Sequence, residues 1–194
     1  MVAQNAETVR KVAELALSDA VEITLLIALM KEQNTGDANK KLNEAGAGRA
    51  AVVARNALIA RLVILIARAY AKVKHGDLHL RVAAELLENN TTRQVFGANN
   101  GAEKLKAFDA QWVKCRGDHR LPRIKDFRDK YTAHLGEPKE IEEATYKELF
   151  DFGAATAKAM ELLALATGVA VNPINTDDSL VTAPQAFWSP WKKT

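Results

Sequence analysis

Two long stretches of regularly spaced apolar residues occupy the first part of the chain. Between Thr8 and Gln33, apolar side chains recur at intervals of three and four with one slip near Ser18, which predicts a long helix. Asn34-Thr35-Gly36 ends it. The same spacing returns from Arg49 to Lys74, with an apolar face wide enough to be buried on more than one side. The polar segment 37–48 between them predicts a connection with one helical turn.

Shorter helices follow, separated by glycine, proline and asparagine. The spacing from Leu78 to Glu88 predicts one of them, and Thr91-x-x-Gln94 is a capping box for a single short turn. Asn100-x-x-Glu103 has the spacing to start a further helix that reaches Cys115. Helical spacing resumes from Arg123 to His134, and the glycine and proline in Leu135-Gly136-Glu137-Pro138 end it.

The last predicted helix begins at a third capping box. Thr145-x-x-Glu148 opens a helix from Tyr146 to Thr167. The segment 168–194 shows no helical period, but it contains Phe187, Trp188 and Trp191. We therefore expect an irregular C-terminal tail that packs on the body of the protein or on a partner.

Composition agrees with an all-α fold. The chain has 34 alanines among its 194 residues, whereas glycine and proline together number only 15. Alanine is the best helix former, and the shortage of turn residues argues against a β-sandwich. No strand-like alternation and no internal repeat is present. The sequence therefore predicts one domain, residues 1–194, folded as an antiparallel bundle with a four-helix core and additional helices.

Cysteine and hydropathy indicate a cytoplasmic protein. Cys115 is the only cysteine, so no intrachain disulfide can form, which fits a reducing compartment. No stretch reaches the ~18 uncharged apolar residues of a membrane span. Acidic residues interrupt the N-terminal segment, which is unlike a signal peptide. We expect neither a membrane partner nor a secretory route.

The positive charge is concentrated in one segment. Residues Lys114 to Lys130 contain seven basic and three acidic side chains, whereas the rest of the chain has 20 basic and 21 acidic ones. This segment can attract phosphates, or it can be an ordinary solvated helix face. Within it, Arg128 and His134 straddle an apolar stripe on either side of Tyr131, about 9 Å apart along the helix axis.

An arginine and a histidine at one groove can cleave RNA without a metal. One base takes the proton of the 2′-hydroxyl, one acid protonates the leaving 5′-oxygen, and a cation stabilises the charge on the phosphorane. One chain supplies a single histidine in this position. A symmetric dimer would supply two, so acid and base can come from different subunits.

The sequence resembles the HEPN superfamily, whose helical bundles contain an Arg-x4-6-His motif, usually with Asn, Asp or His directly after the arginine. Here the motif is Arg128 to His134, followed by Leu135, with Asp129 in the polar position. The chain is most similar to the AbiU-type abortive-infection proteins, which share this late motif. They also share a long helix that ends in an arginine and a nearby aromatic residue, here Arg68 and Tyr70. The resemblance covers 49–167.

The resemblance implies a dimeric ribonuclease of phage-defence or toxin type, without a metal or other cofactor. By this analogy Arg128 and His134 are catalytic, and Asp129 assists them. The expected RNA-binding residues are Arg68, Arg120, Arg123, Lys125, Lys130 and Tyr131. A neighbouring antitoxin protein stays open as a further partner. The alternative function is a non-catalytic helical module that binds a nucleotide or a partner protein, with His134 as a helix cap and Arg128 in a salt bridge.

Other constellations are weaker. Arg68-x6-His75 also matches the motif, but Ala69 follows the arginine. The pairs Cys115/His119 and His75/His79 have the spacing of two metal ligands and lack a third. No phosphate-binding glycine loop is present. Arg61 and Arg68 lie seven residues apart on an apolar helix, which predicts arginines that extend along the edge of the bundle or, alternatively, part of a phosphate site.

Overall fold

The computed structural model describes residues 2–97, 101–129 and 145–192. In these ranges the regular elements are helices. The four long α-helices are α1 (Val2–Gln33), α3 (Gly48–Ala69), α6 (Gly101–Arg116) and α8 (Tyr146–Thr167). The shorter α-helices are α2 (Gly36–Glu44), α4 (Leu80–Leu86), α5 (Asn90–Gln94), α7 (Arg120–Phe127) and α9 (Ser179–Trp188), joined by the 3-10 turns η2 (Ile174–Thr176) and η3 (Ser189–Trp191).

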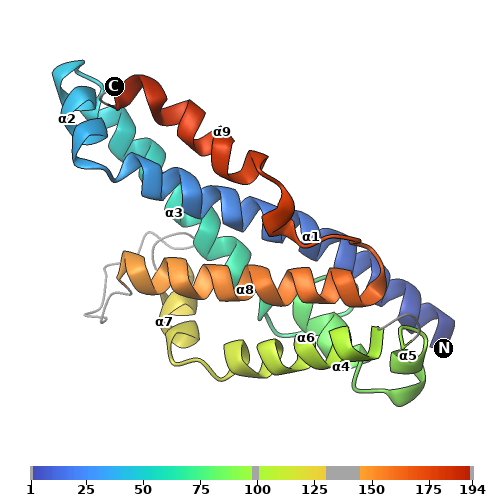
Figure 1. Ribbon diagram of the computed structural model, residues 1–194. Helices are drawn as coiled ribbons and strands as arrows, with labels where there is room; N and C mark the ends of the chain where they lie inside the picture. The colour runs from blue at the N-terminus through green and yellow to red at the C-terminus, as the bar shows by residue number, and fades with distance from the viewer. Residues whose placement is uncertain (1, 98–100, 130–144, 193–194) are drawn as a thin grey trace.

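The core lies around α1 and α8, which run antiparallel (Figure 1). The buried face of α1 is rich in alanine, and these small side chains allow α8 to approach closely. α6 packs on α8, while α4 and α9 pack on α1. The prediction of an all-α antiparallel bundle is therefore confirmed. The buried alanines of α1 are Ala6, Ala13, Ala16 and Ala20.

The helix from Tyr146 to Thr167 has the predicted bounds. Both hydrogen bonds of the capping box are present: Glu148 N–H donates to Thr145 Oγ1 at 3.2 Å, and Thr145 N–H donates to Glu148 Oε2 at 2.9 Å. At the other end Gly168 has φ 76°. Such a left-handed conformation is easily adopted by glycine and ends the helix.

Several helix boundaries differ from those predicted. α1 begins at Val2 and α2 covers two turns, because Ala38 and Leu42 bury one side of it. α3 ends at Ala69, since Tyr70 leaves the helical course and its carbonyl accepts a hydrogen bond from Lys125. α7 begins at Arg120, before Pro122. Proline is tolerated there because the first turn of a helix needs no N–H donor.

The prediction of an irregular tail over 168–194 is wrong for the segment that forms α9. Leu180, Pro184 and Trp188 are four residues apart and bury one face of this helix. α9 lies beside the C-terminal half of α1 in Figure 1. The Lys192 ammonium group forms an ion pair with Glu32 of α1. The tail thus packs on the body, and the proline inside the helix concealed its period in the sequence.

α3 is buried over only part of its length. Its C-terminal half belongs to the core, whereas Val52 and Val53 near its start are exposed, so the expectation of burial on several sides is wrong there. By length and composition α3 is the one helix among the described residues that can cross a bilayer, although core helices of globular proteins pass the same test. Its buried residues are Ile59, Leu62, Val63, Leu65, Ile66, Ala67 and Ala69.

A candidate active site at the end of α7

Arg128 and Asp129 directly follow α7 and contact each other. The Arg128 Nε–H donates to Asp129 Oδ1 at 2.7 Å, and Nη2 donates to the same oxygen. Both side chains are partly exposed to solvent. Arg128 keeps helical backbone angles, with φ −54° and ψ −51°, so the predicted helix continues past Phe127. The predicted site residues Lys130, Tyr131 and His134 lie outside the described residues.

A pocket of about 660 Å³ lies next to this pair. α4 contributes Arg81, α6 contributes Trp112 and Arg116, and α7 contributes Lys125. Asp129 lines the same pocket, which places the carboxylate partner of Arg128 at its edge. Of the predicted RNA-binding residues, Lys125 lines this pocket.

Lys125 connects α7 to the end of α3. Its ammonium group donates a hydrogen bond to the carbonyl oxygen of Tyr70 at 2.9 Å. This carbonyl lies at the negative end of the α3 dipole, where a cation is stabilising. Burial lowers the pKa of Lys125, and the nearby positive charges of Arg81 and Arg128 lower it further. The negative charge of Asp129 acts in the opposite direction, but desolvation and the two arginines outweigh it, so a bound anion would stabilise the charged form of Lys125.

Arg120 holds the turn before α7. Its guanidinium donates to both carboxylate oxygens of Asp118, at 2.8 and 2.6 Å, and its backbone N–H donates to Asp118 Oδ1 at 2.9 Å. The guanidinium also lies over the Phe152 ring of α8, 5.4 Å from its centroid. The hydrogen bonds from Arg120 lower the pKa of Asp118 to about 2. This predicted RNA-binding residue is thus part of a fixed ion pair.

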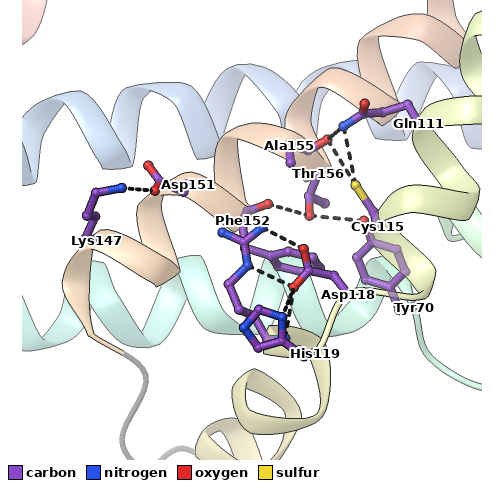
Figure 2. A network of polar contacts seen from close by, with 11 residues as sticks. Tyr70, Gln111, Cys115, Asp118, His119, Lys147, Asp151, Phe152, Ala155 and Thr156 are labelled. Carbon is purple, nitrogen blue, oxygen red and sulfur yellow. Dashed lines mark hydrogen bonds and ion pairs between the residues drawn. The ribbon is translucent and has the colours of Figure 1, made fainter.

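His119 is close to the same carboxylate. Its Nδ1 lies 3.7 Å from Asp118 Oδ1 (Figure 2). The imidazole is largely exposed and is one of the residues that line the pocket. Sequence reasoning considered His119 only as a metal ligand with Cys115. Cys115 is buried, which raises the pKa of its thiol, and no group of three potential metal ligands occurs among the described residues.

Arg123 joins α7 to the start of α8. Its Nη2 donates to Glu148 Oε2 at 2.5 Å, and the same carboxylate oxygen accepts the capping hydrogen bond from the Thr145 N–H. These two contacts connect the helix that leads to Arg128 with the capping box of α8. Arg123 therefore has a structural partner as well as its predicted role in binding RNA.

Arg68 lies away from the pocket. Its Nη2 donates to both carboxylate oxygens of Asp19 on α1, at 2.5 and 2.6 Å. Two helical turns earlier on α3, the guanidinium of Arg61 donates to both carboxylate oxygens of Glu22 on α1. Both arginines are thus at the edge where α3 meets α1, as the interpretation of edge arginines predicts. Arg68 is not among the residues that line the pocket.

A buried polar network surrounds Tyr70, one of the residues that line the pocket (Figure 2). The Tyr70 hydroxyl lies 3.1 Å from Thr156 Oγ1, which itself donates to the Phe152 carbonyl. On the side facing α6, the Tyr70 ring stacks on Trp112 with 5.3 Å between centroids. This network fixes α3, α6 and α8 relative to one another.

Arg81, Arg116 and Trp112 line the pocket, and sequence reasoning did not single them out. Arg81 lies on α4, far from the basic segment in sequence, and only the tertiary fold brings it to Lys125. Arg116 was counted in the basic segment but not singled out. Trp112 gave no signal because its spacing within α6 is that of an ordinary core residue.

The chain matches a family model described as AbiU2, of the HEPN type, over residues 7–181. No curated protein and no solved structure matches it.

Proposed function

The chain belongs to the AbiU2 family of abortive-infection HEPN domains, and we propose that it is a metal-independent RNA endonuclease that acts as a homodimer. The observation that carries this proposal is the Arg128–Asp129 pair at the edge of a pocket lined by basic side chains. The pair occupies the Arg and polar positions of the motif that the family resemblance marks as catalytic.

Each motif residue has a distinct role in this proposal. The 2′-oxygen of the RNA attacks the phosphorus, and the bond from phosphorus to the 5′-oxygen breaks, leaving a 2′,3′-cyclic phosphate and a 5′-hydroxyl. His134 transfers protons, taking one from the 2′-hydroxyl or giving one to the 5′-oxygen. Arg128 stabilises the negative charge of the phosphorane, and Asp129 orients its guanidinium through the 2.7 Å hydrogen bond.

A second copy of the chain completes the proposed chemistry. The reaction needs a base and an acid at the same time, and the motif provides one histidine per chain. A symmetric dimer that brings two motifs together supplies both groups. Sedimentation of the purified protein at micromolar concentration tests this step, with a dimer expected and a monomer against it.

The basic segment supports binding of the RNA backbone. Of the predicted RNA-binding residues that the structure describes, Lys125 lines the pocket, whereas Arg120 and Arg123 have carboxylate partners. Their removal is therefore expected to affect folding as well as RNA affinity. Lys130, Tyr131 and an antitoxin partner stay predictions.

The experiment that tests the proposal is cleavage of single-stranded RNA in EDTA. The wild-type protein is expected to produce 2′,3′-cyclic phosphate ends, and His134→Ala is expected to lose cleavage while it keeps its melting temperature. Cleavage by the His134→Ala protein at the wild-type rate contradicts the proposed role of His134.

The alternative, a module that binds a nucleotide or a partner without catalysis, draws on a different observation. The pocket is lined by side chains from α4, α6 and α7; of the two proposed catalytic residues that the structure describes, Asp129 lines it and Arg128 does not. Under this alternative, binding is weakened by salt and the wild-type protein leaves RNA intact. The two functions are thus separated by the presence or absence of cleaved ends.

A further inference from the structure

Three cationic side chains from three different helices meet at the pocket beside Arg128. They are Arg81 of α4, Arg116 of α6 and Lys125 of α7. The positive charges of Arg81 and Arg128 both lower the pKa of Lys125, so all three groups lie near one another. Cations are seldom gathered from separate helices without a counter-charge, because like charges repel.

Carboxylates near the pocket are mostly occupied by other partners. Asp118 is held by Arg120, and Asp129 is held by Arg128. Asp126 also lines the pocket and is exposed to solvent. Among the described residues, no carboxylate forms an ion pair with Arg116 or Lys125 within 4.0 Å. Two of the three cations therefore lack an anionic partner in this part of the chain.

The remaining walls give the pocket a fixed shape. Trp112 lines it and is held by its stack on Tyr70, while Leu121 and Pro122 line it from the start of α7. A volume of about 660 Å³ is within the usual range of small-molecule sites and has room for a nucleotide. A partly apolar pocket, in which Arg116 and Lys125 form no ion pair with a described carboxylate, is suited to a phosphate group and the sugar attached to it.

We propose that this pocket is a phosphate subsite of the RNA strand, in which Arg81, Arg116 and Lys125 bind a phosphate next to the one that is cleaved. This inference rests on the proposed function, because it takes RNA as the ligand. Its residues differ from the catalytic ones: Arg81 and Arg116 anchor the strand, and the bond cleaved lies at Arg128. The subsite thereby determines how the strand enters the active site.

The test measures RNA binding in the absence of cleavage. A fluorescent single-stranded oligonucleotide is titrated into the His134→Ala protein and into the same protein with Arg81→Ala or Arg116→Ala. Each arginine variant is expected to lose about tenfold in affinity, and the slope of log K against log salt should fall by about 0.7 for each phosphate contact removed. Unchanged affinity and slope in both variants overturn the proposal.

A matched control is Arg93→Ala. Arg81 and its partner Glu85 have side-chain exposures of 29% and 42%, and Arg93 and its partner Asp109 have the same values. Arg93 is not among the pocket residues, so its removal changes net charge equally without touching the subsite. It is expected to keep RNA affinity within twofold. An equal loss in Arg93→Ala shows a general charge effect and contradicts the proposal.

Two further titrations distinguish an internal phosphate of the strand from a phosphate at its 5′ end. The titrations are repeated with a 5′-phosphorylated oligonucleotide and with AMP alone. Losses that are independent of the 5′-phosphate support an internal phosphate, and losses seen only with it support a strand end. AMP that binds as tightly as the oligonucleotide overturns an RNA subsite. Arg116 is exposed and unpaired among the described residues, so Arg116→Ala should fold normally.

The binding test and the test of the proposed function fail in different ways. If His134→Ala still cleaves RNA, the catalytic assignment fails, and the affinities can be measured with DNA of the same sequence, which lacks the 2′-hydroxyl. If cleavage behaves as proposed but Arg81→Ala and Arg116→Ala bind normally, the subsite alone fails.

Discussion

The ammonium group of Lys125 donates a hydrogen bond to the carbonyl oxygen of Tyr70 at 2.9 Å. Through this contact, the helix that leads to Arg128 is attached to the C-terminal end of α3. The same lysine lines the pocket next to Asp129. Lys125 is therefore both a helix-capping residue and part of the proposed RNA site.

Lys125→Met tests this double role. The variant loses a hydrogen bond to the end of a helix, which costs about 1 kcal/mol, or about 2–4 °C in melting temperature for a chain of this size. Lys106→Met, on the exposed side of α6, is the control and should change stability by less than about 0.5 kcal/mol. Thermal unfolding measures both, and equal melting temperatures contradict the capping role.

The Asp118–Arg120 pair should make the free energy of unfolding depend on pH in the acidic range. The pKa of Asp118 is lowered to about 2 from 3.8, so its contribution is present above pH 4 and is lost as pH falls toward 2. Asp118→Asn should cost about 1 kcal/mol at pH 7 because it breaks a largely covered pair. Urea unfolding at pH 7 and pH 3 measures this. A mutant penalty that does not shrink at pH 3 contradicts the assignment.

Arg123 and Glu148 should be energetically coupled. Removing either one breaks the contact between α7 and α8, so the double variant Arg123→Ala/Glu148→Ala should be more stable than the sum of the single effects predicts. We expect a favourable coupling between the two side chains. A double-mutant cycle in urea measures it. Additive single effects would mean that the contact between Arg123 and Glu148 contributes nothing to folding, which contradicts the structural role of this pair.

The packing of α9 on α1 is tested by two neighbouring residues. Leu180 is 6% exposed and Val181 is 59% exposed. Leu180→Ala should lower the free energy of unfolding by about 2–4 kcal/mol, whereas Val181→Ala should lower it by less than about 1 kcal/mol. Similar small effects at both positions show that the tail does not pack on the body.

The sequence predicted best where the determinants of structure are local. The Thr145-x-x-Glu148 box places the start of α8 because both capping groups lie within one turn. α9 was missed because a proline inside a segment argues against a helix, although Leu180, Pro184 and Trp188 have the spacing of a buried face. For α3, the sequence predicts a helix that extends to Lys74, whereas the helix ends at Ala69. Its end depends on a hydrogen bond from Lys125, a residue distant in sequence.

The candidate site was predictable only in part for the same reason. Arg128 and Asp129 are adjacent in sequence, so the motif itself shows that they can interact. The approach of Arg81 to Lys125 depends on how α4 and α7 pack and has no sequence pattern. The ion pair of Arg68 with Asp19 likewise appears only when α3 lies against α1.

The rate of single-stranded RNA cleavage in EDTA, with the ends identified by mass spectrometry, tests the central claim most directly. We predict 2′,3′-cyclic phosphate and 5′-hydroxyl ends from the wild-type protein. Removal of one group that acts only in the transition state costs about 100- to 1000-fold, so Arg128→Ala and His134→Ala should each lose at least about 100-fold in rate. Intact RNA with the wild-type protein, or cleavage at the wild-type rate by either variant, contradicts the account.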